Sequence, residues 1–293
     1  IPPSRKPRAV VDKDGRVIVV AAGHPDDRDW EGVQQSGHEA ILSAATRLNF
    51  PKKALRHRRG NFPALNVGIS HGGGSTEPGN LHHEDENSKE LDALVRHPSF
   101  QRIAGFASSV FHTWAPKLHT HYAQNLDGLL EKHPRLQRNF SNSVFAAAAF
   151  NFGPRTCSKK HRDFANLPYG WCSVTALGQY DYTRGGHLVL WELGLILEFP
   201  PGTTILLPSA AISHSNTPIL AHETRTSFAQ FTAGGLFRWK EHGYQTDEKF
   251  FWGKTQEELA LIALENEARC ELGLSLFSTF EEVEAELHLR GAR

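Results

Sequence analysis

Three residues in the second half of the chain have the types and the spacing of a metal-binding set. His161 and Asp163 lie two positions apart, and His214 follows 51 positions after Asp163 (214 minus 163). In an extended segment, residues i and i+2 point to the same face, so His161 and Asp163 can bind one ion together. A histidine from a distant strand would complete a set of two histidines and one carboxylate, which leaves coordination positions of Fe(II) open. These residues predict a non-haem iron site of the kind that oxygenases use.

Arg225 is a candidate for binding a negatively charged reactant at the same site. It follows His214 by 11 positions (225 minus 214) and precedes Thr226 and Ser227 at the start of a β-type run. A strand of that length would return Arg225 to the same cavity. Because a guanidinium pairs bidentately with carboxylates, we expect Arg225 to bind a dicarboxylate, with a further hydrogen bond from Ser227.

Other histidines are weaker candidates for a metal site. The chain has 17 histidines, so an isolated His-x-Asp pattern is expected by chance, and only its combination with His214 and Arg225 makes it specific. His119 and His121, with His112 nearby, resemble part of a zinc site, but no fourth ligand or cysteine is placed to complete it. We interpret these three as histidines of a helix surface or a loop.

Short β-type runs surround the candidate residues and must position them. From residue 144 onward the runs are separated by Gly and Pro turns, and they cover residues 144–152, 171–177, 186–199, 203–207 and 226–232. That spacing is typical of a compact β-sandwich or barrel. Two of the runs are joined by a turn at residues 200–202, which a jelly-roll needs between its two metal-binding strands. We therefore predict a jelly-roll core.

Helices and one hairpin are expected around this core, which gives an α+β protein. Two β-branched runs flank Asp14-Gly15, so residues 8–20 predict a β-hairpin. Residues 30–48 and 87–136 are predicted to be largely helical, and residues 255–289 an amphipathic helix packed on the outside. We divide the chain into an N-terminal elaboration of the core (1–140), the core itself (141–240) and a C-terminal helical extension (241–293).

Composition narrows the class of protein. Lys plus Arg equals Asp plus Glu at 32 each, so no long-range field steers the chain to an anionic partner. The three cysteines form no CxxC pair, which argues against disulfides and favours a reducing, intracellular compartment. No apolar run of about 18 residues occurs, and residues 1–6 lack the apolar segment of a signal peptide. We expect a soluble protein with no membrane partner.

A basic segment and a glycine-rich segment are two further candidates for binding phosphate. Residues 52–60 carry five positive charges and no acid, so they form either a solvated edge or a patch that contacts phosphates. Residues 71–80 include three consecutive glycines but lack the Gly-Lys-Ser/Thr ending of a phosphate-binding P-loop. We interpret residues 71–80 as a surface loop.

Several segments of the predicted core resemble one family of oxygenases. They are His161-Arg-Asp-Phe-Ala-Asn-Leu-Pro-Tyr-Gly-Trp171, Thr175-Ala-Leu-Gly178, Gly185-Gly186 and Ser213-His-Ser-Asn-Thr-Pro218. These segments resemble the TET/JBP family, which oxidises methylated bases in DNA, and they look most like its fungal branch associated with transposable elements. The resemblance covers residues 144–240 and is thinner outside them.

The resemblance implies a fold, cofactors and roles for particular residues. The family has a double-stranded β-helix core and uses Fe(II), 2-oxoglutarate and O2, releasing succinate and CO2. It implies that His161, Asp163 and His214 bind the iron. Arg225 and Ser227 are then expected to bind 2-oxoglutarate, and Arg155, shortly before the first ligand, is either a second contact to 2-oxoglutarate or a surface arginine.

The resemblance also implies methylated duplex DNA as the partner and a nuclear location. The target base would have to leave the stack to reach the iron, and Phe164, Asn166 and Tyr169 are expected to line its pocket. Relatives commonly have an acid that contacts the base at the position of Asn166, so both 5-methylcytosine and N6-methyladenine stay open. Lys159, Lys160, Arg162 and the basic segment would contact phosphates. The alternative is a 2-oxoglutarate-dependent hydroxylase of a protein side chain or a small molecule.

Overall fold

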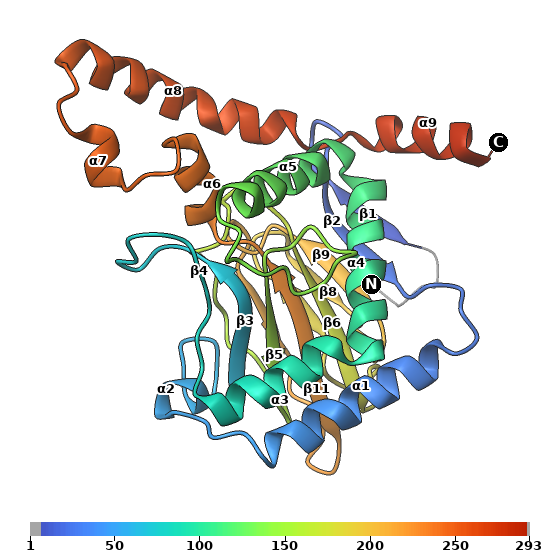
Figure 1. Cartoon of the computed structure of the whole chain (residues 1–293). Coiled ribbons are helices and arrows are strands. Elements are labelled where there is room, and N and C mark those ends of the chain that lie inside the picture. Colours follow the sequence, from blue (N-terminus) through green and yellow to red (C-terminus); the bar gives the residue numbers. More distant parts are fainter. Residues whose placement is uncertain (1–6, 292–293) are drawn as a thin grey trace.

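The computed structural model describes residues 7–291, so residues 1–6, on which part of the signal-peptide argument depends, lie outside the described residues. Two antiparallel sheets form a jelly-roll, the double-stranded β-helix that the sequence predicts, and helices cover the larger sheet (Figure 1). No helix in the described part of the chain is long and apolar enough to cross a membrane.

The larger sheet has eight strands in the order β1-β2-β9-β6-β11-β5-β3-β4. Their bounds are β1 Arg8–Val11, β2 Val17–Gly23, β3 Ala64–Ser70, β4 Gly79–Asn80, β5 Ala147–Asn151, β6 Cys172–Gln179, β9 Thr204–Leu207 and β11 Thr224–Phe231. The smaller sheet contains β7 Leu188–Leu190, β8 Leu195–Leu197 and β10 His214–Asn216 in the order β10-β7-β8. Buried residues of both sheets, including Leu190, Ile205 and Leu207, pack together between them.

Strands from the N-terminal range belong to the larger sheet. The hairpin predicted around Asp14-Gly15 is confirmed, because β1 pairs with β2, and Gly15 adopts a φ of 77° that suits a tight turn. β2 also pairs with β9, and β3 pairs with β5. The hydrogen bonding of the sheet therefore continues across the boundary expected at residue 140.

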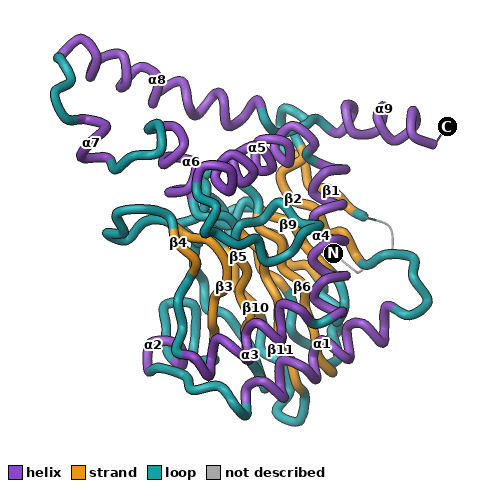
Figure 2. Tube along the Cα trace, in the orientation of Figure 1, coloured by secondary structure: helices purple, strands orange, loops and turns teal. Residues whose placement is uncertain are grey.

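Four helices cover one face of the larger sheet, and Figure 2 shows them along the strands and at their upper end. They are α1 Trp30–Ala45, α3 Asp85–Arg96, α4 Pro98–Trp114 and α5 Pro116–Lys132, and the short α2 spans Lys52–Leu55. Pro98 and Pro116 occupy the first turns of α4 and α5, where a missing N–H costs no helical hydrogen bond. α1 packs on β6 and β11, and α4 packs on β2 and β9, which buries this face of the sheet.

Phe228 tests the contribution of that helix-covered face to stability. Its ring is 1% exposed and lies 5.1 Å from the ring of Phe100 and 5.2 Å from that of Phe150, measured between centroids. Phe228→Ala should lower the free energy of unfolding by about 3–5 kcal/mol, since it leaves a cavity. Urea denaturation measures the loss. Phe164→Ala is the matched control at a ring that is 75% exposed, and an equal loss for both would contradict the packing described.

The C-terminal region differs from the expectation of one helix packed on the outside. It contains α6 Gly234–Glu241, α7 Asp247–Phe251, α8 Gln256–Ser275 and α9 Phe280–Gly291. α8 projects away from the sheets in Figure 1, and Gly273 is its one buried residue. The apolar residues of its first half, Leu259 to Leu264, are spread around the helix instead of forming one stripe, so no single face can be buried.

Candidate metal centre

Backbone pairing brings the three candidate ligands together. The N–H of His161 donates to the carbonyl of His214 at 3.1 Å, and the N–H of His214 donates back at 2.9 Å. The segment that contains His161 therefore lies beside β10, which carries His214. The N–H of Asp163 donates to the carbonyl of Ser209 at 2.8 Å, and this bond fixes the third residue next to the pair.

The side chains of the triad converge. Asp163 Oδ1 lies 3.8 Å from His161 Nε2, and Asp163 Oδ2 lies 3.7 Å from His214 Nε2. One ligand atom from each residue lies within 4.8 Å of the others, and no other such group of His, Cys, Asp or Glu occurs in the described part of the chain. With metal–ligand bonds of about 2.1 Å, adjacent ligand atoms are roughly 3 Å apart, so a small closure of the side chains would suit one ion.

Both histidines have the tautomer that a metal ligand needs. The Nδ1 of His161 lies 2.7 Å from the carbonyl of Lys159, and the Nδ1 of His214 lies 3.0 Å from the carbonyl of Ile212. A carbonyl only accepts, so each Nδ1 carries the proton and each Nε2 keeps its lone pair. Burial, followed by the proximity of His214, lowers the pKa of His161 to about 4. Its imidazole is therefore neutral at physiological pH.

Arg225 lies buried next to this centre with part of its hydrogen-bonding capacity unused. The residue is 1% exposed, and its Nη1 donates to the carbonyl of Thr156 at 2.9 Å. Its Nε has no hydrogen-bond partner, and its guanidinium lies 5.8 Å and 5.7 Å from the ring centroids of Tyr180 and Phe199. Buried polar groups are nearly always paired, so this guanidinium fits a carboxylate such as that of 2-oxoglutarate.

Ser227 shares the face of β11 on which Arg225 lies, because the two are separated by one residue of a strand. Its hydroxyl accepts a hydrogen bond from Asn151 Nδ2 at 3.0 Å. Asn151 Oδ1 is also buried without a hydrogen-bond partner, so an unsatisfied polar atom belongs to the residue that Ser227 contacts. Thr156 and Ser227 line the cavity that contains the triad, and Arg225 lies directly behind Thr156.

The cavity has a volume of about 220 Å³ and opens beside the triad. Residues of the larger sheet that line it, and that the sequence did not single out, are Asn66, Ala149, Asn151, Cys172, Val174, Ala229 and Phe231. Strand alternation in β11 could have predicted two of them, because Ala229 and Phe231 lie on the same face of the strand as Arg225 and Ser227. Asn66 carries no such signal, because only the pairing of β3 with β5 brings it near.

Of the three residues expected to line a base pocket, the structure brings one to the cavity. Asn166 lines it and donates from Nδ2 to Ser209 Oγ at 3.0 Å. Phe164 is 75% exposed, and Tyr169 packs beside His121 of α5, with 6.0 Å between ring centroids. The chain turns directly after Asp163, since the N–H of Asn166 donates to the carbonyl of Asp163 at 2.8 Å, so proximity in sequence does not place Phe164 or Tyr169 at the cavity.

Arg155 is also directed away from the cavity. Its side chain is exposed and donates to the carbonyl of Ala221 at 3.5 Å. Its neighbour Thr156 faces the cavity, and neighbouring residues in extended backbone point to opposite sides. This position supports the surface alternative for Arg155 and does not support a contact to 2-oxoglutarate.

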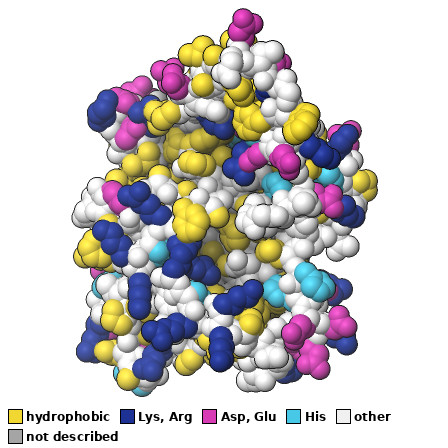
Figure 3. Space-filling model, turned by 90° about the vertical axis from the view of Figure 1, so that its left-hand side faces the viewer, with side chains coloured by type: hydrophobic (Ala, Val, Ile, Leu, Met, Phe, Trp, Pro, Cys, Tyr) yellow, Lys and Arg dark blue, Asp and Glu magenta, His cyan; other side chains and the backbone are white. Residues whose placement is uncertain are grey.

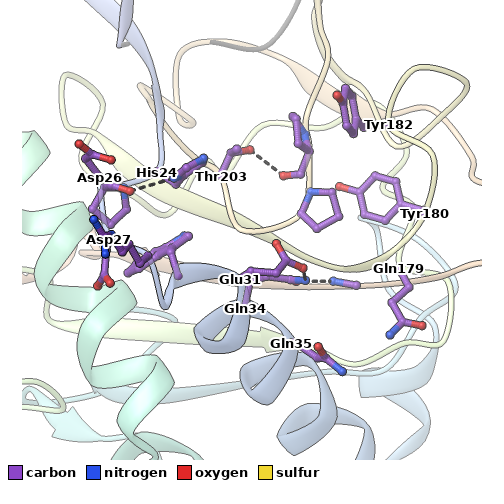
Figure 4. Close-up of a pocket in the computed structure, with 16 residues that line it drawn as sticks. His24, Asp26, Asp27, Glu31, Gln34, Gln35, Gln179, Tyr180, Tyr182 and Thr203 are labelled. Carbon is purple, nitrogen blue, oxygen red and sulfur yellow. Dashed lines mark hydrogen bonds between the residues drawn. The ribbon is translucent and has the colours of Figure 1, made fainter. Parts of the chain in front are cut away.

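Two further features do not form competing sites. His119 and His121 of α5 point to different neighbours: His119 lies against Phe111 and His121 stacks on Phe237, so they cannot share an ion. A cavity of about 720 Å³ lies between residues 24–35, the end of β6 and the turn before β9 (Figure 4). None of its lining residues has a buried side-chain nitrogen or oxygen atom without a hydrogen-bond partner, so none of them demands a ligand.

Comparisons with known proteins show the fold. A scan against protein-family models and a search of curated proteins each found no match. Among solved structures, NgTET1 in complex with 5mC DNA is 17% identical, with a TM-score of 0.56, and the match covers 89% of this chain and 86% of that one.

Two other matches have lower TM-scores. OsALKBH1 is 10% identical with a TM-score of 0.37, covering 67% of this chain and 91% of that one. An oxidoreductase of the 2OG-Fe(II) oxygenase family from Burkholderia pseudomallei is 17% identical with a TM-score of 0.35, covering 69% and 85%. The likeness to NgTET1 shows that this chain and NgTET1 share one fold.

Proposed function

We propose that this chain, which has the fold and the ligand set of Fe(II)- and 2-oxoglutarate-dependent oxygenases, oxidises a methyl group on a base of duplex DNA. The observation that carries the proposal is the convergence of His161, Asp163 and His214 beside a buried Arg225 with an unpaired Nε. The likeness to NgTET1, whose solved complex contains 5mC DNA, supports DNA as the substrate. Membership of the fungal transposon-associated branch of TET/JBP enzymes and a nuclear location are parts of the same proposal.

The residues of the site have distinct tasks in this proposal. His161, Asp163 and His214 hold Fe(II) through two Nε2 atoms and one carboxylate, while Arg225 and Ser227 orient 2-oxoglutarate by its distal carboxylate. The bound iron and co-substrate supply the oxidation of a C–H bond by O2, with release of succinate and CO2. The protein fixes both imidazole rings by the Nδ1 hydrogen bonds, so that each Nε2 is directed at the ion.

The shape of the site requires the base to leave the helix. A methyl group within a stacked duplex cannot enter a cavity of about 220 Å³ enclosed by β5, β6 and β11. The nucleotide must therefore flip out of the stack, as in other enzymes that act on bases. The half-buried ring of Phe231 at the cavity is available for stacking, and the amide of Asn166 for hydrogen bonds to the base edge.

The substrate is tested with duplexes that differ only in their methyl group. The protein is incubated with Fe(II), 2-oxoglutarate and duplexes that contain 5-methylcytosine, N6-methyladenine or no methyl group, and nucleosides are measured by mass spectrometry. We expect oxidation of one methylated duplex and no change in the control. Conversion of 2-oxoglutarate to succinate without oxidation of either duplex would refute DNA as the substrate and favour a protein side chain or small molecule.

A further inference from the structure

Arg58 and Arg59 occupy the tip of a tight turn that follows α2. The N–H of His57 donates to the carbonyl of Gly60, and the N–H of Gly60 donates back, both at 3.0 Å. A Cβ at Gly60 would lie 2.7 Å from the ring of Phe62, so only glycine fits there. The carbonyl of Arg59 accepts the N–H of Lys159 at 2.7 Å, which fixes the turn against the segment leading to His161.

The two arginines differ in their partners. Arg58 donates to the carbonyl of Arg162, lies 3.3 Å from Asp163 Oδ1 and places its guanidinium 4.7 Å from the centre of the Phe164 ring. The half-buried guanidinium of Arg59 has neither a hydrogen bond nor an ion pair with any residue that the structure describes. Burial lowers the pKa of Arg59, and Asp163 attracts it only at longer range. A partly desolvated cation without a partner is unfavourable, and an anionic ligand would relieve it.

Charge balance favours an anion from the substrate. In a loaded site, the charges of Fe(II), 2-oxoglutarate, Asp163 and Arg225 cancel one another. Arg58 stays next to the Asp163 carboxylate, whereas Arg59 remains without a compensating charge beside the cavity. A neutral side chain or small molecule would leave Arg59 so, whereas a phosphodiester strand would neutralise it.

The turn also connects the cavity with a longer groove. Arg58, Arg59 and Asn66 line both the triad cavity and a groove of about 780 Å³ between α2 and the start of α3. The other basic side chains and histidines that line the groove are Lys53, His57, His82 and His83. Figure 3 views the side on which α2 lies in Figure 1, where Lys and Arg side chains gather below a hollow lined by hydrophobic ones.

We propose that the guanidinium of Arg59 binds a backbone phosphate next to the flipped nucleotide, and that the same strand continues along the groove between α2 and α3. This inference rests on the proposed function and makes it narrower. Arg59 would hold the register of the strand, so that one nucleotide faces the triad. Because the contact is to a phosphate, it positions the strand and does not read the base.

The test measures binding of a duplex with one 5-methylcytosine, in the presence of Mn(II) and 2-oxoglutarate so that no turnover occurs. Arg59→Gln should raise the Kd about tenfold at 0.1 M salt, because a charge-assisted contact is lost. The slope of log Kd against log salt should fall by about 0.9, the value of one phosphate contact. Arg59→Lys should keep most of the slope. A neutral methylphosphonate beside the target should weaken binding by the wild-type protein but not by Arg59→Gln.

Arg96→Gln is the matched control, because Arg96 lies on α3 and lines neither the cavity nor the groove. It should bind the duplex like the wild type, and thermal melting checks that each variant is folded. An unchanged Kd and salt slope for Arg59→Gln, with oxidation of DNA by the wild type, would overturn this inference and leave the proposed function standing. A wild-type protein that neither binds nor oxidises the duplex would overturn both.

Discussion

Asp163→Ala should abolish the metal site and all turnover of 2-oxoglutarate. Asp163 is the only carboxylate of the triad, and its two oxygens lie 3.8 Å and 3.7 Å from the Nε2 atoms of His161 and His214. Loss of a residue that only supports a ligand already costs 10–100-fold in metal affinity, so loss of a ligand should weaken binding by more than about 100-fold. Co(II) absorbance or Mn(II) resonance measures the affinity without any need for activity.

Thermal melting gives a second measurement of the same variant. A metal present at 100 times its Kd stabilises the folded protein by about 2.7 kcal/mol, so Co(II) should raise the Tm of the wild type. The same addition should leave the Tm of Asp163→Ala unchanged. Asp92→Ala is the matched control, because Asp92 pairs with Arg96 on the exposed side of α3 and lies outside the cavity. Wild-type affinity for one Co(II) in Asp163→Ala would refute the assignment of the site.

The three candidate metal ligands could be predicted from the sequence for a physical reason. His161, Asp163 and His214 are constrained by chemistry to particular residue types, and strand alternation constrains their direction. The structure brings the three together and leaves Arg225 buried behind Thr156. The binding of 2-oxoglutarate by Arg225 stays a prediction, as does the occupation of the triad by iron.

The other residues that line the cavity were harder to predict from the sequence, because they come from segments far apart in the chain. Proximity in sequence to Asp163 predicts that Phe164 and Tyr169 line the site, but the turn after Asp163 directs both elsewhere. Asn66 reaches the cavity through the pairing of β3 with β5, and Arg59 through the hydrogen bond from the N–H of Lys159 to its carbonyl. Contacts between segments so far apart leave no local pattern.

The fold shows the same division between local and long-range information. The hairpin around Asp14-Gly15 and the helices within residues 87–136 depend on local turn and helix chemistry, and the structure confirms them. The joining of β2 and β3 to the larger sheet depends on contacts with strands far along the chain. The prediction that the segment of α8 is helical is confirmed. The prediction that it packs on the outside of the core is wrong for α8, because its first turns have no single apolar face.

Arg225→Met separates binding of the co-substrate from stability of the fold. Burial of a cation with an unsatisfied Nε costs free energy, and in the protein without ligand one carbonyl and two ring faces offset it. Apolar residues of similar volume often replace buried charged groups with little loss of stability, or with a gain. We therefore expect the Tm of the variant, measured without ligands, to stay near that of the wild type or to rise.

The same substitution should nearly eliminate binding of 2-oxoglutarate. Removal of one partner from a buried charge pair costs about 2–5 kcal/mol, so the Kd for 2-oxoglutarate, measured by calorimetry with Mn(II) present, should rise by at least about 30-fold. 2-Oxoglutarate should raise the Tm of the wild type and not that of Arg225→Met. Affinity for Co(II) alone should be retained, because Arg225 contacts none of the three ligands. A large fall in Tm together with wild-type affinity for 2-oxoglutarate would refute this role. It would mean that the buried Arg225 stabilises the fold and does not bind the co-substrate.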